Sequence, residues 1–256
     1  VGTKRIQSEK ITIDLTKEFP AVVGKKVHPR AALVEMMWIM SGRTDIEFLK
    51  ENGVNYWDSW VKPDGTLGPI YGEQMRNFLG VDQLQNVVDE ILRNPDSRRL
   101  MVSLWNPAQL KDQALECCHH DYQICSFVDH DGIRKLDLHL KQRSADSFLG
   151  IPYDFMLFAY YLHFISIATG IQVNHIHISM ADYHRYNNHE EQIREYLNNY
   201  FNDPANKFHF NIEYYQSFDK FTRPQLEFDQ DLLNEFHRTV TDGNRIDLLI
   251  DLVIQH

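Results

Sequence analysis

The order of apolar and polar residues predicts strands and helices in the first half of the chain. Apolar and polar residues alternate over positions 10–15, which predicts a half-buried strand. Pro29 precedes apolar residues at helical spacing up to Trp38, and apolar positions recur at the same spacing over 81–92. Both stretches predict amphipathic helices, the first with proline in its first turn.

The second half of the chain predicts more strands, broken by one long apolar helix. Residues 99–105, 122–128 and 135–140 read as short strands, and Asp131-Gly132 joins the last two as a hairpin. Residues 152–169 are apolar on nearly every face, which predicts a buried helix rather than a membrane span. A strand over 171–178 and a helix over 190–198 follow.

This mixture lacks a regular alternation of strands and helices, so it favours an α+β fold with a mixed sheet. The 256 residues, 43% of them hydrophobic, fit a single domain spanning 1–256, although the part after about 218 yields no clear prediction. A net charge of −10 argues against direct nucleic-acid or anionic-membrane binding, so an anionic ligand would need a local basic cluster. Three cysteines, an odd number, argue against a disulfide framework and favour the cytoplasm.

The most reactive segment is 116–120, Glu-Cys-Cys-His-His. A cysteine there can be a thiolate nucleophile, a metal ligand or an inert buried thiol, and the sequence admits all three. The other imidazole-rich stretches, near His175 and near His184, contain no cysteine, so we expect no metal. Arg98, Arg99 and Arg143 stand near predicted strand ends, where guanidinium groups suit a phosphate.

Four segments, 96–99, 118–119, 142–153 and 182–189, together resemble the thymidylate synthase family in order and spacing. The resemblance runs from about residue 2 to about residue 197 and fades afterwards. It implies a three-layer α+β fold and a homodimer formed through a face of the sheet. It also implies folate-dependent transfer of a one-carbon unit from 5,10-methylenetetrahydrofolate to C5 of a pyrimidine nucleotide, without a metal.

The resemblance assigns roles to individual residues. Cys118 would add covalently to C6 of the base, which makes C5 nucleophilic. The other residues implied for catalysis and for the base are Glu35 as a proton relay, Tyr71 near C5, and His119 and Gln123 as supporting polar groups. The nucleotide phosphate would meet Arg143 and Ser144, with Arg98 and Arg99 reaching across from a second subunit, and the sugar would meet His184 and Tyr186. The folate would meet Asp146, Gly150, Trp57, Trp60, Tyr153 and Lys25.

Asp154 departs from the family pattern, because thymidylate synthases have an asparagine there that donates to uracil O4. An ionised carboxylate can only accept hydrogen bonds, so it suits the amino edge of cytosine. The change resembles deoxycytidylate hydroxymethylases of the same family. A carboxylate in the first turn of a helix can also serve the helix dipole without touching a ligand.

We therefore expect C5 hydroxymethylation of dCMP, with dCMP methylation and ordinary thymidylate synthesis from dUMP as alternatives. Ser144 beside Arg143 favours a deoxynucleotide over CMP. A remoter alternative is a non-catalytic metal- or nucleotide-binding protein that uses the 116–120 segment structurally. Two further departures are that the family's N-terminal phosphate-binding arginine would align just before Val1, and that residues 248–256 do not resemble the family's closing segment.

Overall fold

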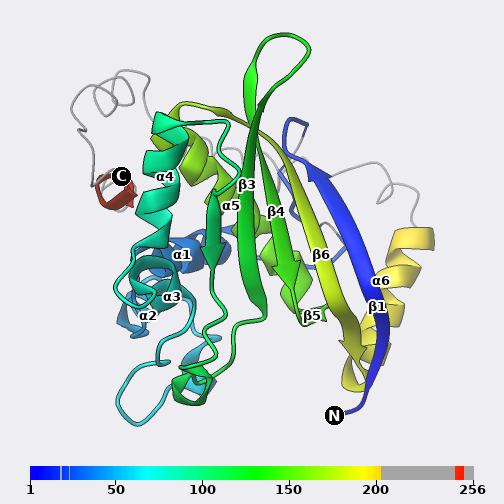
Figure 1. The fold of residues 1–256 in the computed structure, drawn as a ribbon. Helices are drawn as coiled ribbons and strands as arrows, with labels where there is room; N and C mark the ends of the chain where they lie inside the picture. Colours follow the sequence, from blue (N-terminus) through cyan, green and yellow to red (C-terminus); the bar gives the residue numbers. More distant parts are fainter. Residues whose placement is uncertain (18, 23, 203–245, 251–256) are drawn as a thin grey trace.

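The computed structural model describes residues 1–17, 19–22, 24–202 and 246–250, which form a mixed sheet packed with helices (Figure 1). The sheet order is β1-β6-β4-β3-β2, with β5 paired to β6. Strands β4 and β5 run parallel to β6, and the other pairs are antiparallel. The predicted mixed α+β architecture is therefore confirmed. The strands are β1 (Thr3–Asp14), β2 (Met101–Ser103), β3 (His119–Val128), β4 (Arg134–Gln142), β5 (Ala145–Asp146) and β6 (Gln172–Tyr186).

A buried helix, α5 (Gly150–Thr169), connects the parallel strands β4 and β6. Its apolar residues surround it because it packs on the sheet on one side and on α1 on the other. The helix ends at Gly170, whose φ of 72° is the left-handed conformation that glycine adopts without strain. By length and composition α5 could cross a membrane, but two-thirds of its apolar window is buried inside the protein, as in a core helix.

Helices α1 to α4 lie on the same side of the sheet as α5, whereas α6 lies beside β1 at the edge of the sheet (Figure 1). Helix α1 packs on α5 and α3, and α4 packs on α5 and β2. Sheet, α5 and α1 thus make three successive layers, as the resemblance implies. The helix bounds are α1 (Pro29–Met40), α2 (Glu47–Glu51), α3 (Tyr71–Asn77), α4 (Gln83–Arg93) and α6 (Glu190–Asn202), with short 3-10 turns η1 (Asp58–Trp60), η2 (Leu110–Asp112) and η3 (Asn187–His189).

Along the central strand β4, buried apolar side chains alternate with polar side chains that point to the opposite face. Leu136, Leu138 and Leu140 of β4 are buried toward α5, so Asp137 and His139 between them point to the opposite face. We call the side facing α5 the helix face and the other side the open face.

The predicted hairpin of β3 and β4 is confirmed, whereas several strand limits were wrong. The strand expected at 99–105 is only three residues long, because its pairing with β3 covers only Met101–Ser103. The strand expected at 171–178 continues to Tyr186, and the first strand begins at Thr3, because these two strands pair along nearly their whole length. The segment after 218, which yielded no clear prediction, lies outside the described residues except for 246–250.

Candidate active site

The backbone at Cys118 is fixed just before β3 begins. Its N–H donates to the hydroxyl of Tyr71 at 2.9 Å, and its carbonyl accepts from the N–H of Arg143 at 2.9 Å. The side chain is half-buried and free, whereas the neighbouring Cys117 is fully buried. Of these two adjacent thiols, only that of Cys118 can reach a ligand.

Arg143 holds the cysteine loop with its guanidinium group. Its Nε donates to the Cys117 carbonyl at 2.9 Å, and its Nη2 donates to the Glu116 carbonyl at 2.7 Å. Burial raises the pKa of the Cys118 thiol, the positive charge of Arg143 lowers it, and the negative charge of Asp154 raises it. Arg143 therefore both shapes the loop and favours the thiolate, a double role that lysine lacks because it has no planar fork.

Asp154 lies on the second turn of α5 and is bound by a side chain, not by the helix backbone. Its Oδ2 accepts a hydrogen bond of 2.7 Å from Nε2 of Gln142 at the end of β4. Burial, opposed by this hydrogen bond and reinforced by Glu35 and Asp146, raises the pKa of Asp154 to about 7. The carboxyl group therefore changes its charge near neutral pH, and the geometry does not match a helix-capping role.

Gln142 is a residue that the sequence analysis did not assign to the site. Its side chain is 1% exposed, and its Oε1 has no hydrogen-bond partner among the described residues. A buried amide oxygen without a donor is costly, so it is available to a bound ligand. Its place beside Arg143 in the 142–153 segment was the signal that could have identified it.

Glu35 is buried on α1 with both carboxylate oxygens occupied. Oε2 accepts from the Tyr56 hydroxyl at 2.6 Å, and Oε1 accepts from Nε1 of Trp57 at 2.7 Å. Burial raises the pKa of Glu35, while these two hydrogen bonds lower it. Trp57 is mostly buried and its N–H is committed to Glu35, so it does not offer the open ring surface expected for folate. Tyr56 was missed because a lone tyrosine gives no signal of its partner.

Two residues expected beside the base lie elsewhere. His119 is 5% exposed, stacks on Tyr71 with ring centres 4.2 Å apart, and shares a 2.6 Å hydrogen bond with the Tyr122 hydroxyl. Burial lowers its pKa to about 3, so it is a neutral support behind Tyr71. Gln123 projects from the open face, where its Nε2 donates to the Arg98 carbonyl at 3.5 Å. The polar group beside Asp154 is Gln142 instead.

The residues around Cys118 include Tyr71, Arg143 and Asp154. A comparison with known protein families finds a match over most of the chain. The family model described as thymidylate synthase matches residues 1–231. This chain belongs to the thymidylate synthase family. The match extends past residue 197, where the recognisable motifs end, and membership supports folate-dependent one-carbon transfer to C5 of a pyrimidine nucleotide.

The geometry does not support the alternative in which segment 116–120 binds a structural metal. Cys117 and His119 face the core, and burial raises the pKa of Cys117 to about 12. Among the described residues, the candidate metal-ligand group contains no member of this segment.

The residues expected at the nucleotide include both buried and exposed side chains. Strand β5 aligns Asp146 with His184 on β6, and His184 is 8% exposed with its Nδ1 3.0 Å from Oδ1 of Asp182. Tyr186 meets its ring edge-on at 5.3 Å. Half-buried Ser144 follows Arg143, whereas Arg98 and Arg99 are exposed beyond α4, as donation to a second subunit would require.

Most residues expected at the folate surround the start of α5. Asp146 accepts backbone N–H bonds from Phe148 and Leu149 at 3.0 and 3.3 Å. A Cβ at Gly150 would stand 3.6 Å from the Asp146 side chain and 3.9 Å from Oδ2 of Asp154, so glycine keeps the space between the two carboxyl groups open.

The outer members of the folate group remain accessible. Lys25 donates to the Phe148 carbonyl at 2.5 Å, and burial lowers its pKa. Tyr153 lies 6.1 Å from the Tyr56 ring, and Trp60 is 45% exposed. A cation, Lys25, and an aromatic ring, Tyr153, near the start of α5 fit an anionic, ring-containing co-substrate.

Proposed function

We propose that this protein hydroxymethylates dCMP at C5, with Cys118 as the covalent nucleophile and Asp154 as the group that reads the base. The proposal depends chiefly on the carboxyl group of Asp154, held by Gln142 close enough to Cys118 for its charge to raise the thiol pKa. An asparagine would be neutral there, so the carboxyl group changes what the site can recognise.

Cytosine suits this carboxyl group because the pair can share one proton. Cytosine presents an amino group and a basic ring nitrogen, N3, whereas uracil presents a carbonyl oxygen and an N3–H. With a pKa of about 7, Asp154 can hold a proton for N3 and accept from the amino group. Against uracil, the ionised form would face the carbonyl oxygen O4, a repulsive contact, whereas the protonated form could donate to O4, so the preference for cytosine depends on the ionised form. We assign the orphan Oε1 of Gln142 to the second amino hydrogen.

The same proton assists covalent addition. As the Cys118 sulfur bonds to C6, electron density moves toward N3, which takes the proton from Asp154 and leaves a carboxylate accepting two hydrogen bonds. Arg143 favours the attacking thiolate, and the Tyr71 hydroxyl holds the Cys118 backbone in place. C5 then attacks the methylene carbon of methylenetetrahydrofolate. Loss of the C5 proton and cleavage of the carbon–nitrogen bond release tetrahydrofolate and leave a methylene group on C5.

The final step distinguishes hydroxymethylation from methylation. Once the methylene group is on C5, addition of water gives a hydroxymethyl group, whereas hydride transfer gives a methyl group and dihydrofolate. We assign activation of that water to Glu35, whose pKa is raised by burial and whose geometry is fixed by Tyr56 and Trp57. Loss of the sulfur from C6 then restores the aromatic ring.

The nucleotide phosphate would be held by Arg143 and Ser144, with Arg98 and Arg99 from a second copy in a homodimer. Arg143 uses two of its five donors on the loop carbonyls, so donors remain for phosphate oxygens. The exposed positions of Arg98 and Arg99 support this sharing.

A product analysis tests the proposal. The protein is incubated with methylenetetrahydrofolate and dCMP, CMP or dUMP in separate reactions, and each product is identified by mass while dihydrofolate is followed by absorbance. We expect hydroxymethyl-dCMP without dihydrofolate. Methyl-dCMP with dihydrofolate would exclude hydroxymethylation, and conversion of dUMP with dCMP untouched would refute the role of Asp154.

A further inference from the structure

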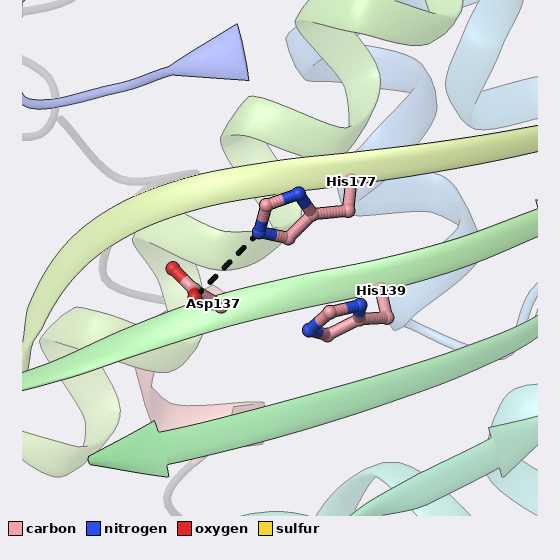
Figure 2. A group of neighbouring side chains, drawn as sticks. All are labelled: Asp137, His139 and His177. Atoms are coloured by element: carbon pink, nitrogen blue, oxygen red, sulfur yellow. Dashed lines mark ion pairs between the residues drawn. The ribbon is translucent and has the colours of Figure 1, made fainter. Parts of the chain in front are cut away.

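The open face of the sheet carries a compact group of potential metal ligands, which we call the histidine cluster: Asp137 and His139 of β4 and His177 of β6. Their ligand atoms all lie within 4.8 Å of one another (Figure 2). Nε2 of His177 is 3.6 Å from Oδ2 of Asp137, and the two imidazole rings stack with centres 4.6 Å apart. The cluster lies across two parallel strands, on the face opposite the buried leucines of β4.

Asp137 is oriented by its surroundings so that one oxygen is left for a ligand. Its Oδ1 accepts hydrogen bonds from Nδ2 of Asn174 at 2.8 Å and from the N–H of His175 at 2.9 Å. The register of β4 and β6 shifts at this point, which brings both donors opposite Asp137. Oδ2 therefore points toward His177 with its orientation fixed.

His177 is oriented in the same manner from the neighbouring strand. Its Nδ1 is 3.0 Å from the hydroxyl of Thr12 on β1. When Nδ1–H donates to that hydroxyl, Nε2 carries the lone pair and faces Asp137. A hydrogen bond to the second ring nitrogen is the usual support of a metal-binding histidine, because it fixes the tautomer and the ring.

We propose that the histidine cluster binds one divalent transition ion of the zinc class per chain. Zinc binds nitrogen and carboxylate oxygen at about 2.0–2.2 Å in tetrahedral geometry, which requires ligand atoms about 3.4 Å apart. The 3.6 Å between His177 and Asp137 already meets this requirement. His139 is exposed, so its ring can close the remaining distance by side-chain rotation.

The local and global charges favour a cation. The net charge of the chain is −10. Lys141, the next residue outward on the open face of β4, is 3.5 Å from the Asp121 carboxylate, which offsets its charge. Two nitrogens and one oxygen suit zinc, and three protein ligands leave a fourth position for water or another donor. Because the ion would link β4 to β6, it would stabilise the sheet rather than take part in the reaction at Cys118.

Cobalt titration tests the site directly. Protein without an affinity tag, carrying Cys118→Ser to remove the catalytic thiol, is treated with chelator and titrated with Co²⁺ while its visible spectrum and thermal unfolding are recorded. We expect one equivalent per chain, a tetrahedral Co²⁺ spectrum, displacement by Zn²⁺ and a higher melting temperature. Size-exclusion chromatography establishes the oligomeric state, since the proposed dimer would use this face.

Variants assign the binding to the cluster. His139→Ala and His177→Ala should each weaken the affinity by at least about tenfold. His130→Ala, in the exposed hairpin turn, should leave the affinity unchanged and is the matched control. Without metal, the melting temperature and oligomeric state of each variant are compared with those of the parent, since the proposed dimer would use this face. Equal affinity in parent and both cluster variants, no binding at micromolar Co²⁺, or an intense sulfur-to-cobalt band from Cys125 would overturn the proposal.

Discussion

The two faces of the sheet use the same residue types for different purposes. On the helix face, Asp154 is half-buried and has one side-chain donor, Gln142, and burial raises its pKa to about 7. On the open face, Asp137 receives an amide side chain and a backbone N–H and lies at the edge of solvent. Burial raises the pKa of the first carboxyl group, whereas two hydrogen bonds fix the orientation of the second.

The three thiols differ in a comparable manner. Cys117 is buried against the core, Cys118 is half-buried beside Arg143, and Cys125 lies on the open face next to Asp137. Local environment, not residue type, therefore distinguishes the three thiols and makes Cys118 the candidate nucleophile.

The largest expected effect is on turnover, when serine replaces the cysteine on one face or on the other. Cys118→Ser should lower turnover by more than about 10⁴-fold, because a serine hydroxyl is a far weaker nucleophile at neutral pH. Product formation from dCMP or dUMP measures the effect, and circular dichroism verifies the fold. Cys125→Ser is the control and should retain activity. Appreciable turnover by Cys118→Ser would refute covalent catalysis.

The second prediction concerns the base. Asp154→Asn should reverse the ratio of kcat/KM for dCMP over dUMP, with a change of about 10²-fold or more, because an amide can donate to uracil O4. Competition between the two nucleotides in one reaction gives the ratio directly. Asp121→Asn, which alters an ion pair on the open face, should leave it unchanged. An unchanged ratio in Asp154→Asn would show that another residue reads the base.

The sequence was sufficient for elements whose pattern is local. The long apolar helix, the hairpin around Asp131-Gly132 and the helix beginning at Pro29 depend on periodicity and turn chemistry within one segment. Strand ends were less accessible, because Met101–Ser103 and the extension to Tyr186 depend on partners far along the chain.

For the site as well, local motifs predicted some residues, whereas contacts between distant segments decided others. Family motifs led to Cys118, Arg143 and Asp154, which the structure brings together. They could not show that His119 faces the core or that Gln123 points to the open face, because a bulge between His119 and Asp121 shifts the register of β3. The sequence did not predict the histidine cluster, because its members come from two strands that are 38 positions apart and meet only in the sheet.

The smallest predicted effect concerns the stability cost of keeping a carboxyl group on the helix face. The folded protein holds the Asp154 proton more tightly than the unfolded chain, since the pKa rises from 3.8 to about 7. The wild-type protein therefore loses stability from this group as the pH rises from about 4 through 7. Asp154→Asn should remove that loss and raise the free energy of unfolding at pH 8 by about 1–3 kcal/mol. This is less than the upper limit of about 4 kcal/mol, because part of the side chain meets solvent.

Urea unfolding of ligand-free wild type and Asp154→Asn across pH 4–8 measures this difference, which should shrink toward zero at the acidic end. Asp121→Asn serves as the comparison from the open face, since its carboxylate lies beside Lys141 in a solvated ion pair and should show no gain at pH 8. A difference between wild type and Asp154→Asn that is independent of pH would mean that packing, not the charge, separates them. In that case Asp154 would not hold a proton near neutral pH, and the proposal that it reads cytosine through a shared proton would fail with it.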